Sequence, residues 1–149
     1  MSAKLALDIQ RASRAPHIPS DRNLRAWARA ALTRDASLTI RYVAETEGRR
    51  LNREFRGKDH ATNVLTFVYE DARGRALEGD IVLCAPVVAR EAREQGKPVA
   101  DHHAHLVVHG LLHLQGMDHE GSATQAALME RREKRILRGL GIGDPYAAR

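Results

Sequence analysis

Cysteine, aromatic residues and long apolar runs are all scarce in this chain of 149 residues. Its one cysteine, Cys84, rules out an internal disulfide and fits the reducing cytoplasm, where we expect the protein to act. No run of roughly eighteen or more apolar residues is found, and the N-terminus lacks the apolar core of a secretion signal, so no contact with a membrane is expected. At 4%, aromatic residues are too few to form the base-stacking sheet of an RRM-type RNA-binding domain.

Positive charge, by contrast, is plentiful, with 24 lysines and arginines against 19 aspartates and glutamates. The formal net charge of +5 favours an anionic partner, for which nucleic acid is the natural candidate. Arginine outnumbers lysine by 20 to 4, which a GC-rich genome would also produce. The charge therefore supports contact with a phosphate backbone and says little about readout of bases. Length and composition predict one globular domain over residues 1–149.

Hydrophobic periodicity predicts alternating strands and helices along this domain. Short alternating runs predict four strands, the last two joined as a hairpin, at residues 4–10, 38–43, 63–69 and 79–85. Helical spacing predicts helices at residues 20–33, 45–55, 86–95 and 122–139, with a further helix that begins at Pro98. That further helix is apolar on nearly every side, so we expect it to be buried.

The segment from His109 to His119 carries the most specific chemical signal. It spaces three imidazoles as H-x3-H-x5-H. On a helix, His109 and His113 lie one turn apart on the same face. Gly116 can adopt the left-handed conformation that ends a helix, which would turn His119 back toward the same ion. Three imidazole nitrogens with a fourth position left to water are typical of a catalytic zinc site.

This spacing reproduces the frame of the metzincin zinc helix, with one element missing. Gly110 stands where a metalloprotease carries its glutamate base, so a peptidase is disfavoured. A fourth protein ligand, either Cys84 or an aspartate, would instead make the site structural. Of the remaining histidines, His102 and His105 are expected to be structural groups or to support the ligands, whereas ordinary surface positions are expected for His17, His60 and His103.

The same eleven residues resemble the H-G-x-L-H-L-x-G-Y-D-H signature of the YbeY family, which comprises bacterial zinc-dependent endoribonucleases implicated in ribosomal RNA maturation and ribosome quality control. Residues 51–67 resemble that family's L-N-x-x-Y/F-R-x-K-D-x-P-T-N/D-V-L-S-F block, and residues 79–84 and 144–146 resemble its G-D-I strand and D-P-Y ending. The likeness runs from about residue 38 to the end. The departures are conservative and remove no ligand: Ala61 for proline, Thr66 for serine and Met117 for tyrosine.

The resemblance implies an α+β fold, with a small mixed sheet of about four strands flanked by helices and a zincin-like metal helix in the core. It implies one Zn²⁺ ion on His109, His113 and His119, and a single-stranded RNA substrate that includes the 3′ end of 16S rRNA. The ribosomal small subunit and an Era-type GTPase are the protein partners it suggests. It also gives Arg56 a functional role, whereas pairing with Asp59 or with a helix end is the structural alternative.

Metal-assisted phosphodiester hydrolysis is the mechanism we expect from these residues. Either the zinc ion or Arg56 would neutralise the phosphate as its charge grows, and a guanidinium can bind two phosphate oxygens at once. Asp118 either orients a ligand or accepts a proton, or it closes the turn after Gly116. The rival hypotheses are a zinc-stabilised RNA-binding ribosome assembly factor that cuts nothing and a hydrolase of small molecules. The general base, and the choice between water and a ribose 2′-hydroxyl as the attacking group, stay open.

Overall fold

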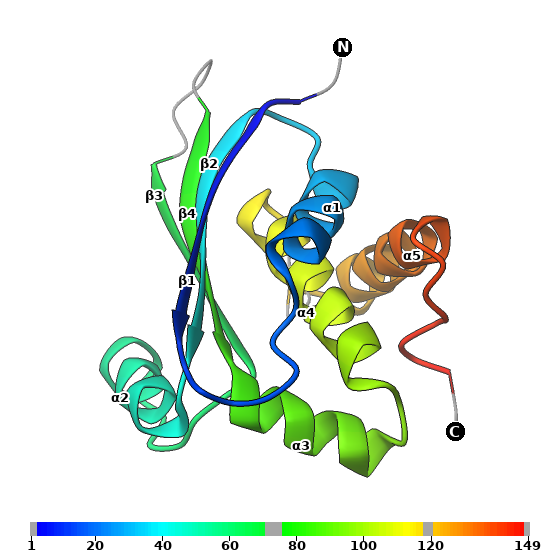
Figure 1. Cartoon of the computed structure of the whole chain (residues 1–149). Helices are drawn as coiled ribbons and strands as arrows, with labels where there is room; N and C mark the ends of the chain where they lie inside the picture. The colour runs from blue at the N-terminus through cyan, green and yellow to red at the C-terminus, as the bar shows by residue number, and fades with distance from the viewer. Residues whose placement is uncertain (1–2, 71–75, 118–120, 148–149) are drawn as a thin grey trace.

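A mixed sheet with helices on both of its faces makes up the molecule, which was analysed as a computed structural model (Figure 1). The structure describes residues 3–70, 76–117 and 121–147. Within these ranges the elements in chain order are β1 (Leu5–Ala12), α1 (Asp21–Ala31), β2 (Ala36–Val43), α2 (Glu45–Arg56), β3 (Val64–Glu70), β4 (Leu77–Cys84), α3 (Ala85–Gln95), α4 (Val99–Leu114) and α5 (Ala123–Gly139).

The sheet has the strand order β1-β2-β4-β3. β1, β2 and β4 run parallel, and β3 pairs antiparallel with β4. Parallel neighbours need a crossover, and α1 supplies the one between β1 and β2. The α+β architecture and the predicted hairpin of β3 and β4 are thus confirmed. None of the helices in the described ranges is long and apolar enough to cross a membrane.

Successive residues of each strand point to opposite faces of the sheet, so the sheet divides the core in two. The larger cluster lies on the side of α1 and α4 and includes Ile40 and Ile81. The smaller one lies under α2 and includes Val82 and Cys84, whose Sγ lies 3.2 Å from where a Cβ on Gly48 would be. Cys84 is therefore a buried hydrophobe on the face that α4 does not cover, which removes it as a fourth ligand for a metal ion on the histidines of α4.

α4 is the central helix, enclosed by the sheet and by α1, α3 and α5 (Figure 1). Its predicted burial is confirmed, because nearly all of its residues from His102 to Leu114 are buried. Gly110 permits the close approach of this helix to the sheet. A Cβ at position 110 would lie 3.2 Å from Cγ2 of Ile81 in β4. The residue after the first histidine of the motif thus faces the sheet.

The expectation that His103 lies at the surface is wrong. Its exposed fraction is 1%, and its Nδ1 lies 2.9 Å from the hydroxyl of Tyr42 in β2. All four residues of α4 from His102 to His105 are buried, so the helix has no solvent-facing side at this turn. Burial, aided by the nearby His102 and His17, lowers the pKa of His103 from 6.5 to about 4.

This lowered pKa predicts an acid-sensitive contribution of His103 to stability. Between pH 6.5 and 4, His103 is protonated in the unfolded chain but stays neutral in the folded chain. The free energy of unfolding therefore falls as the pH falls. The loss amounts to about 3 kcal/mol at ~1.4 kcal/mol per pH unit. Urea unfolding across this pH range should give a shallower pH dependence for His103→Gln than for the wild type. The exposed His60, changed to glutamine, should keep the wild-type slope; equal slopes for His103→Gln and wild type would contradict the assignment.

Candidate metal and phosphate site

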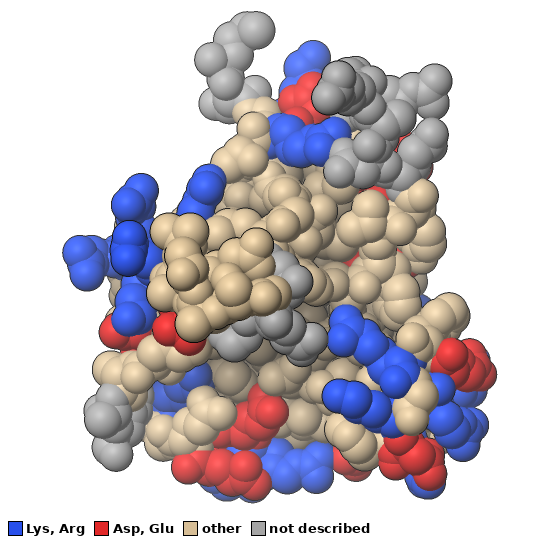
Figure 2. Space-filling view, turned by 180° about the vertical axis from the view of Figure 1, so that it is seen from behind, with Lys and Arg blue, Asp and Glu red and all other residues tan. Residues whose placement is uncertain are grey.

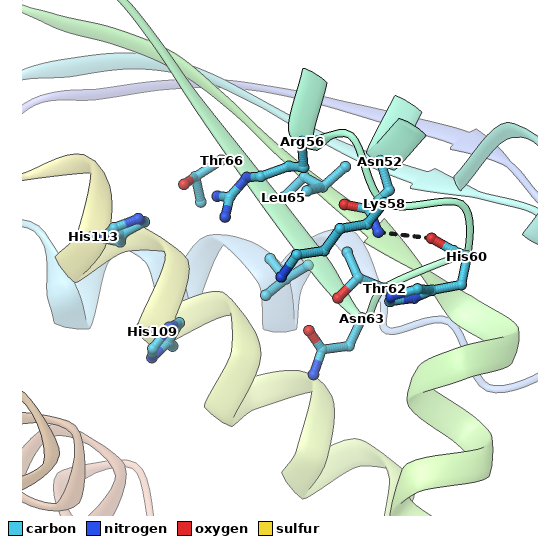
Figure 3. A pocket seen from close by; sticks show the side chains of 11 residues that line it. Asn52, Arg56, Lys58, His60, Thr62, Asn63, Leu65, Thr66, His109 and His113 are labelled. Atoms are coloured by element: carbon cyan, nitrogen blue, oxygen red, sulfur yellow. Dashed lines mark hydrogen bonds between the residues drawn. The ribbon is translucent and has the colours of Figure 1, made fainter. Parts of the chain in front are cut away.

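A cleft of about 260 Å³ opens between α4 and the segment that joins α2 to β3. Histidines form one wall and cationic or amide side chains form the other (Figure 3). The residues that line it come from α2, the joining segment, β3 and α4, and are Asn52, Arg56, Lys58, His60, Thr62, Asn63, Val64, Leu65, Thr66, His109 and His113.

His109 and His113 lie side by side on the cleft wall, as their spacing predicts. Their ring centroids are 6.3 Å apart and the ring planes are within 28° of parallel. In each ring Nδ1 is engaged away from the cleft: that of His109 lies 2.7 Å from Oε1 of Glu133, and that of His113 lies 2.9 Å from the carbonyl oxygen of Met117. A donor proton on Nδ1 makes Nε2 the lone-pair nitrogen, which is the arrangement of a metal-binding imidazole.

The chain reverses direction directly after these two histidines. Gly116 has a φ of 100°, in the region that favours glycine, and Met117 donates its backbone N–H to the carbonyl of Leu112. The predicted turn at Gly116 is confirmed. Asp118 and His119 lie outside the described residues, so their roles as a catalytic group and as the third metal ligand stay predictions.

Glu133 of α5 is the important residue that the sequence analysis missed. Its side chain is fully buried, with Oε1 2.7 Å from Nδ1 of His109 and Oε2 2.8 Å from Nε2 of His105. The hydroxyl of Tyr146 donates to the same carboxylate at 2.6 Å. Burial alone would raise the pKa of Glu133, but the hydrogen bonds from His105, His109 and Tyr146 outweigh it and hold the pKa at about 2.

His105, His109 and Glu133 form a group that could hold a metal ion, since they offer ligand atoms within 4.8 Å of one another. The two nitrogen–oxygen separations, however, are those of charge-assisted hydrogen bonds. We therefore assign Glu133 the role of orienting the imidazoles, as carboxylates commonly do behind zinc-bound histidines. His105 shares this carboxylate with His109, which agrees with the expectation of a structural or supporting group.

A second carboxylate links the buried side of α4 to the opposite wall of the cleft. Oε1 of Glu91 in α3 lies 2.9 Å from Nε2 of His102 and accepts a hydrogen bond of 3.0 Å from the side-chain amide of Asn63. Asn63 lines the cleft next to β3. His102 is thus a buried structural group, as expected, and it helps to fix the position of a cleft residue.

Arg56 ends α2, and its guanidinium points into the cleft toward the wall that carries His113 (Figure 3). Asp59, its expected alternative partner, pairs instead with Arg49 at 2.8 Å and with Arg53 at 3.8 Å. Among the described side chains, no ion pair involves Arg56. Lys58, which the sequence analysis did not single out, also extends into the cleft, on the side of His109 (Figure 3). Two cations therefore face two imidazoles.

Comparison with known proteins identifies the family of this site. The family model described as Endoribonuclease YbeY matches residues 11–141. The chain belongs to the YbeY family. The match begins well before residue 38, so the likeness extends further toward the N-terminus than the motifs alone indicated.

Individual YbeY relatives cover the chain closely. A protein of Aromatoleum aromaticum named Endoribonuclease YbeY is 57% identical over 98% of this chain and 95% of its own length. One of the same name from Azoarcus is 58% identical over 87% of this chain, which spans 53% of that longer protein. The solution structure of a Thermotoga maritima protein superposes with a TM-score of 0.57 at 25% identity and covers 95% of this chain and 99% of the other.

Proposed function

We propose that this chain is a metal-dependent endoribonuclease that cuts single-stranded RNA. One observation carries the proposal: within a single cleft, two imidazoles with Nδ1 engaged from behind face the side chains of Arg56 and Lys58. This arrangement suits the cleavage of a phosphodiester: the two cations would neutralise charge on its oxygens, and a metal ion held by the imidazoles would act as a Lewis acid. The name Endoribonuclease YbeY, carried by relatives more than half identical, supports RNA as the substrate.

His109, His113 and His119 are the residues that would hold one Zn²⁺ ion. The donor set fits the metal, because imidazole is a preferred zinc ligand and Glu133 and the Met117 carbonyl hold two of the rings in the required tautomer. When bound, zinc supplies Lewis acidity toward a phosphate oxygen and a water molecule.

The protein's own groups would bind and orient the scissile phosphate. Arg56 can donate two parallel hydrogen bonds to its oxygens, and Lys58 adds a point charge from the same wall. These interactions strengthen as negative charge develops, so they favour the transition state over the bound substrate. Asp118 is proposed to orient a ligand or to accept a proton, as its place beside His119 suggests.

Ribosomal RNA, including the 3′ end of 16S rRNA, is the substrate that we propose from the family resemblance. The same resemblance supports a cytoplasmic setting, the ribosomal small subunit and an Era-type GTPase as partners, and a single domain over residues 1–149. Retention of the family's L-N-x-x-Y/F-R block, which supplies Asn52 and Arg56 to the cleft, supports this assignment.

Removal of the metal tests the proposal directly. The purified protein should contain about one zinc per chain and cut single-stranded RNA, as one ion held by three histidines requires. Chelation should abolish cleavage, and added zinc should restore it. Metal without cleavage, with RNA still bound, would overturn the nuclease proposal in favour of a zinc-stabilised RNA-binding factor. Cleavage that survives complete removal of the metal would overturn metal dependence.

A further inference from the structure

The solvent face of α5 carries a row of arginines that the cleft does not use. Arg131, Arg132, Arg135 and Arg138 are all exposed. In the part of the chain that the structure describes, none of the four has an ion pair. Lys134, between them, is occupied differently: it lies 3.6 Å from Asp144 and 5.9 Å from the centre of the Tyr146 ring. We call the four exposed residues the arginine face.

The direction of the arginine face is fixed by the buried side of the same helix. Met129, Glu133 and Leu137 follow one another every fourth residue and are fully buried. At about 100° per residue, Arg131 and Arg135 project nearly opposite Glu133. Because Glu133 is bonded to His105 and His109 of α4, α5 cannot easily rotate about its axis. The arginines are thus held in a constant orientation relative to the cleft.

Basic side chains gather on two flanks of one face of the molecule, one over α5 and the other over α2 (Figure 2). The cleft lies between α2 and α4, and α5 packs against α4. The α2 flank leads to Arg56 and Lys58 inside the cleft, whereas the arginine face lies beyond the histidine wall. A chain of phosphates that leaves the cleft past α4 would therefore meet a second positive surface.

We propose that the arginine face of α5 binds the phosphate backbone of the RNA strand that occupies the cleft. The inference rests on the proposed function for the nature of the strand. Guanidinium groups bind phosphate oxygens in pairs, and several such contacts in a row give affinity without base specificity. An anionic lipid surface is a poorer fit, because a membrane-bound helix needs a free apolar face and that of α5 is buried against α4.

Neutralisation of the arginine face tests this inference. The α5 triple variant replaces three residues of the arginine face by glutamine: Arg131, Arg135 and Arg138. The matched control loses the same charge from α1, where glutamine replaces Arg22, Arg25 and Arg29. Binding of a long fluorescently labelled single-stranded RNA is measured over a range of salt concentrations in a His113→Ala background, so that no substrate is consumed. For the α5 triple, the slope of log K against log salt should become shallower by about 2, with roughly tenfold weaker binding at low salt.

The α1 control should leave that slope nearly unchanged. With His113 restored, the α5 triple variant should cleave at the wild-type rate a short oligoribonucleotide that occupies only the cleft. For the long RNA, the same variant should show a raised KM. An unaltered slope, or equal losses in both triples, would overturn the inference. The inference would also be overturned, in favour of a lipid surface, if the α5 triple variant lost binding to anionic vesicles but kept its RNA binding. Absence of cleavage by the wild type, with the slope still altered, would instead refute the proposed nuclease function alone.

Discussion

Replacement of His113 by alanine is expected to abolish metal binding and to slow RNA cleavage by about a thousandfold. The variant removes one imidazole of the pair whose ring centroids lie 6.3 Å apart. The Met117 carbonyl, which lies 2.9 Å from Nδ1 of His113, cannot replace the lost nitrogen ligand. Loss of about 4 kcal/mol of transition-state stabilisation from the metal corresponds to a roughly thousandfold lower rate. Zinc content by mass spectrometry and cleavage of single-stranded RNA measure the two effects. His60→Ala, which alters an exposed residue of the same cleft, should keep the metal.

Arg56→Ala should separate phosphate recognition from metal binding. We expect the zinc content to be unchanged and the rate of cleavage to fall by about 10²–10³, the loss typical of one preorganised charge donor. If Arg56→Ala loses zinc along with activity, or His113→Ala keeps both, the division of labour between the two walls of the cleft is wrong. Thermal unfolding of the metal-free proteins should show that both variants still fold, because both side chains line an open cleft.

Replacement of Glu133 by alanine is expected to cause the largest loss of stability of any substitution considered. Three groups, on His105, His109 and Tyr146, would lose their shared acceptor in the interior. Removal of one partner of a buried charged network costs about 3–5 kcal/mol. Zinc affinity should fall by about 10–100-fold as well, since His109 would no longer be held in one tautomer. Urea unfolding of the metal-free protein and a zinc titration measure the two losses.

A conservative variant keeps this prediction testable if the alanine variant does not fold. Glu133→Gln retains one acceptor oxygen, so we expect about half of the stability loss and a measurable fall in zinc affinity. The exposed Glu94 of α3, changed to glutamine, should shift stability by less than about 0.5 kcal/mol. Wild-type zinc affinity in Glu133→Gln would show that the carboxylate supports only the packing of α5 on α4.

The secondary structure could be predicted closely because local chemistry and tertiary packing agree in this chain. A helix was expected to begin at residue 20, and the hydroxyl of Ser20 caps α1 by accepting from the backbone N–H of Asn23. Pro86 was expected to open α3, and it occupies the first turn of that helix. Predicted and observed strand ends differ by at most two residues, and pairing with β2 extends the end of β1 to Ala12 and the start of β4 to Leu77.

Partners that lie far apart along the chain were harder to predict. His109 and His113 share a helix, so their spacing alone brings them together. Glu133 comes from another helix, where it is one of many charged residues and its depth depends on packing. The available signal was its position between Met129 and Leu137 on the apolar stripe of α5, where a carboxylate must have partners. His103 was misplaced for the same reason, because Tyr42, which covers it, lies far away along the chain in β2.

The close contact between α4 and β4 has a consequence for how this zinc-helix frame can diversify. Since the position after the first histidine points at Ile81, a glutamate introduced there would enter the apolar layer under the helix, away from the cleft that His109 and His113 line. One codon change therefore does not lead from this scaffold to a peptidase. An evolutionary path between the two chemistries would first have to lift the helix off its sheet.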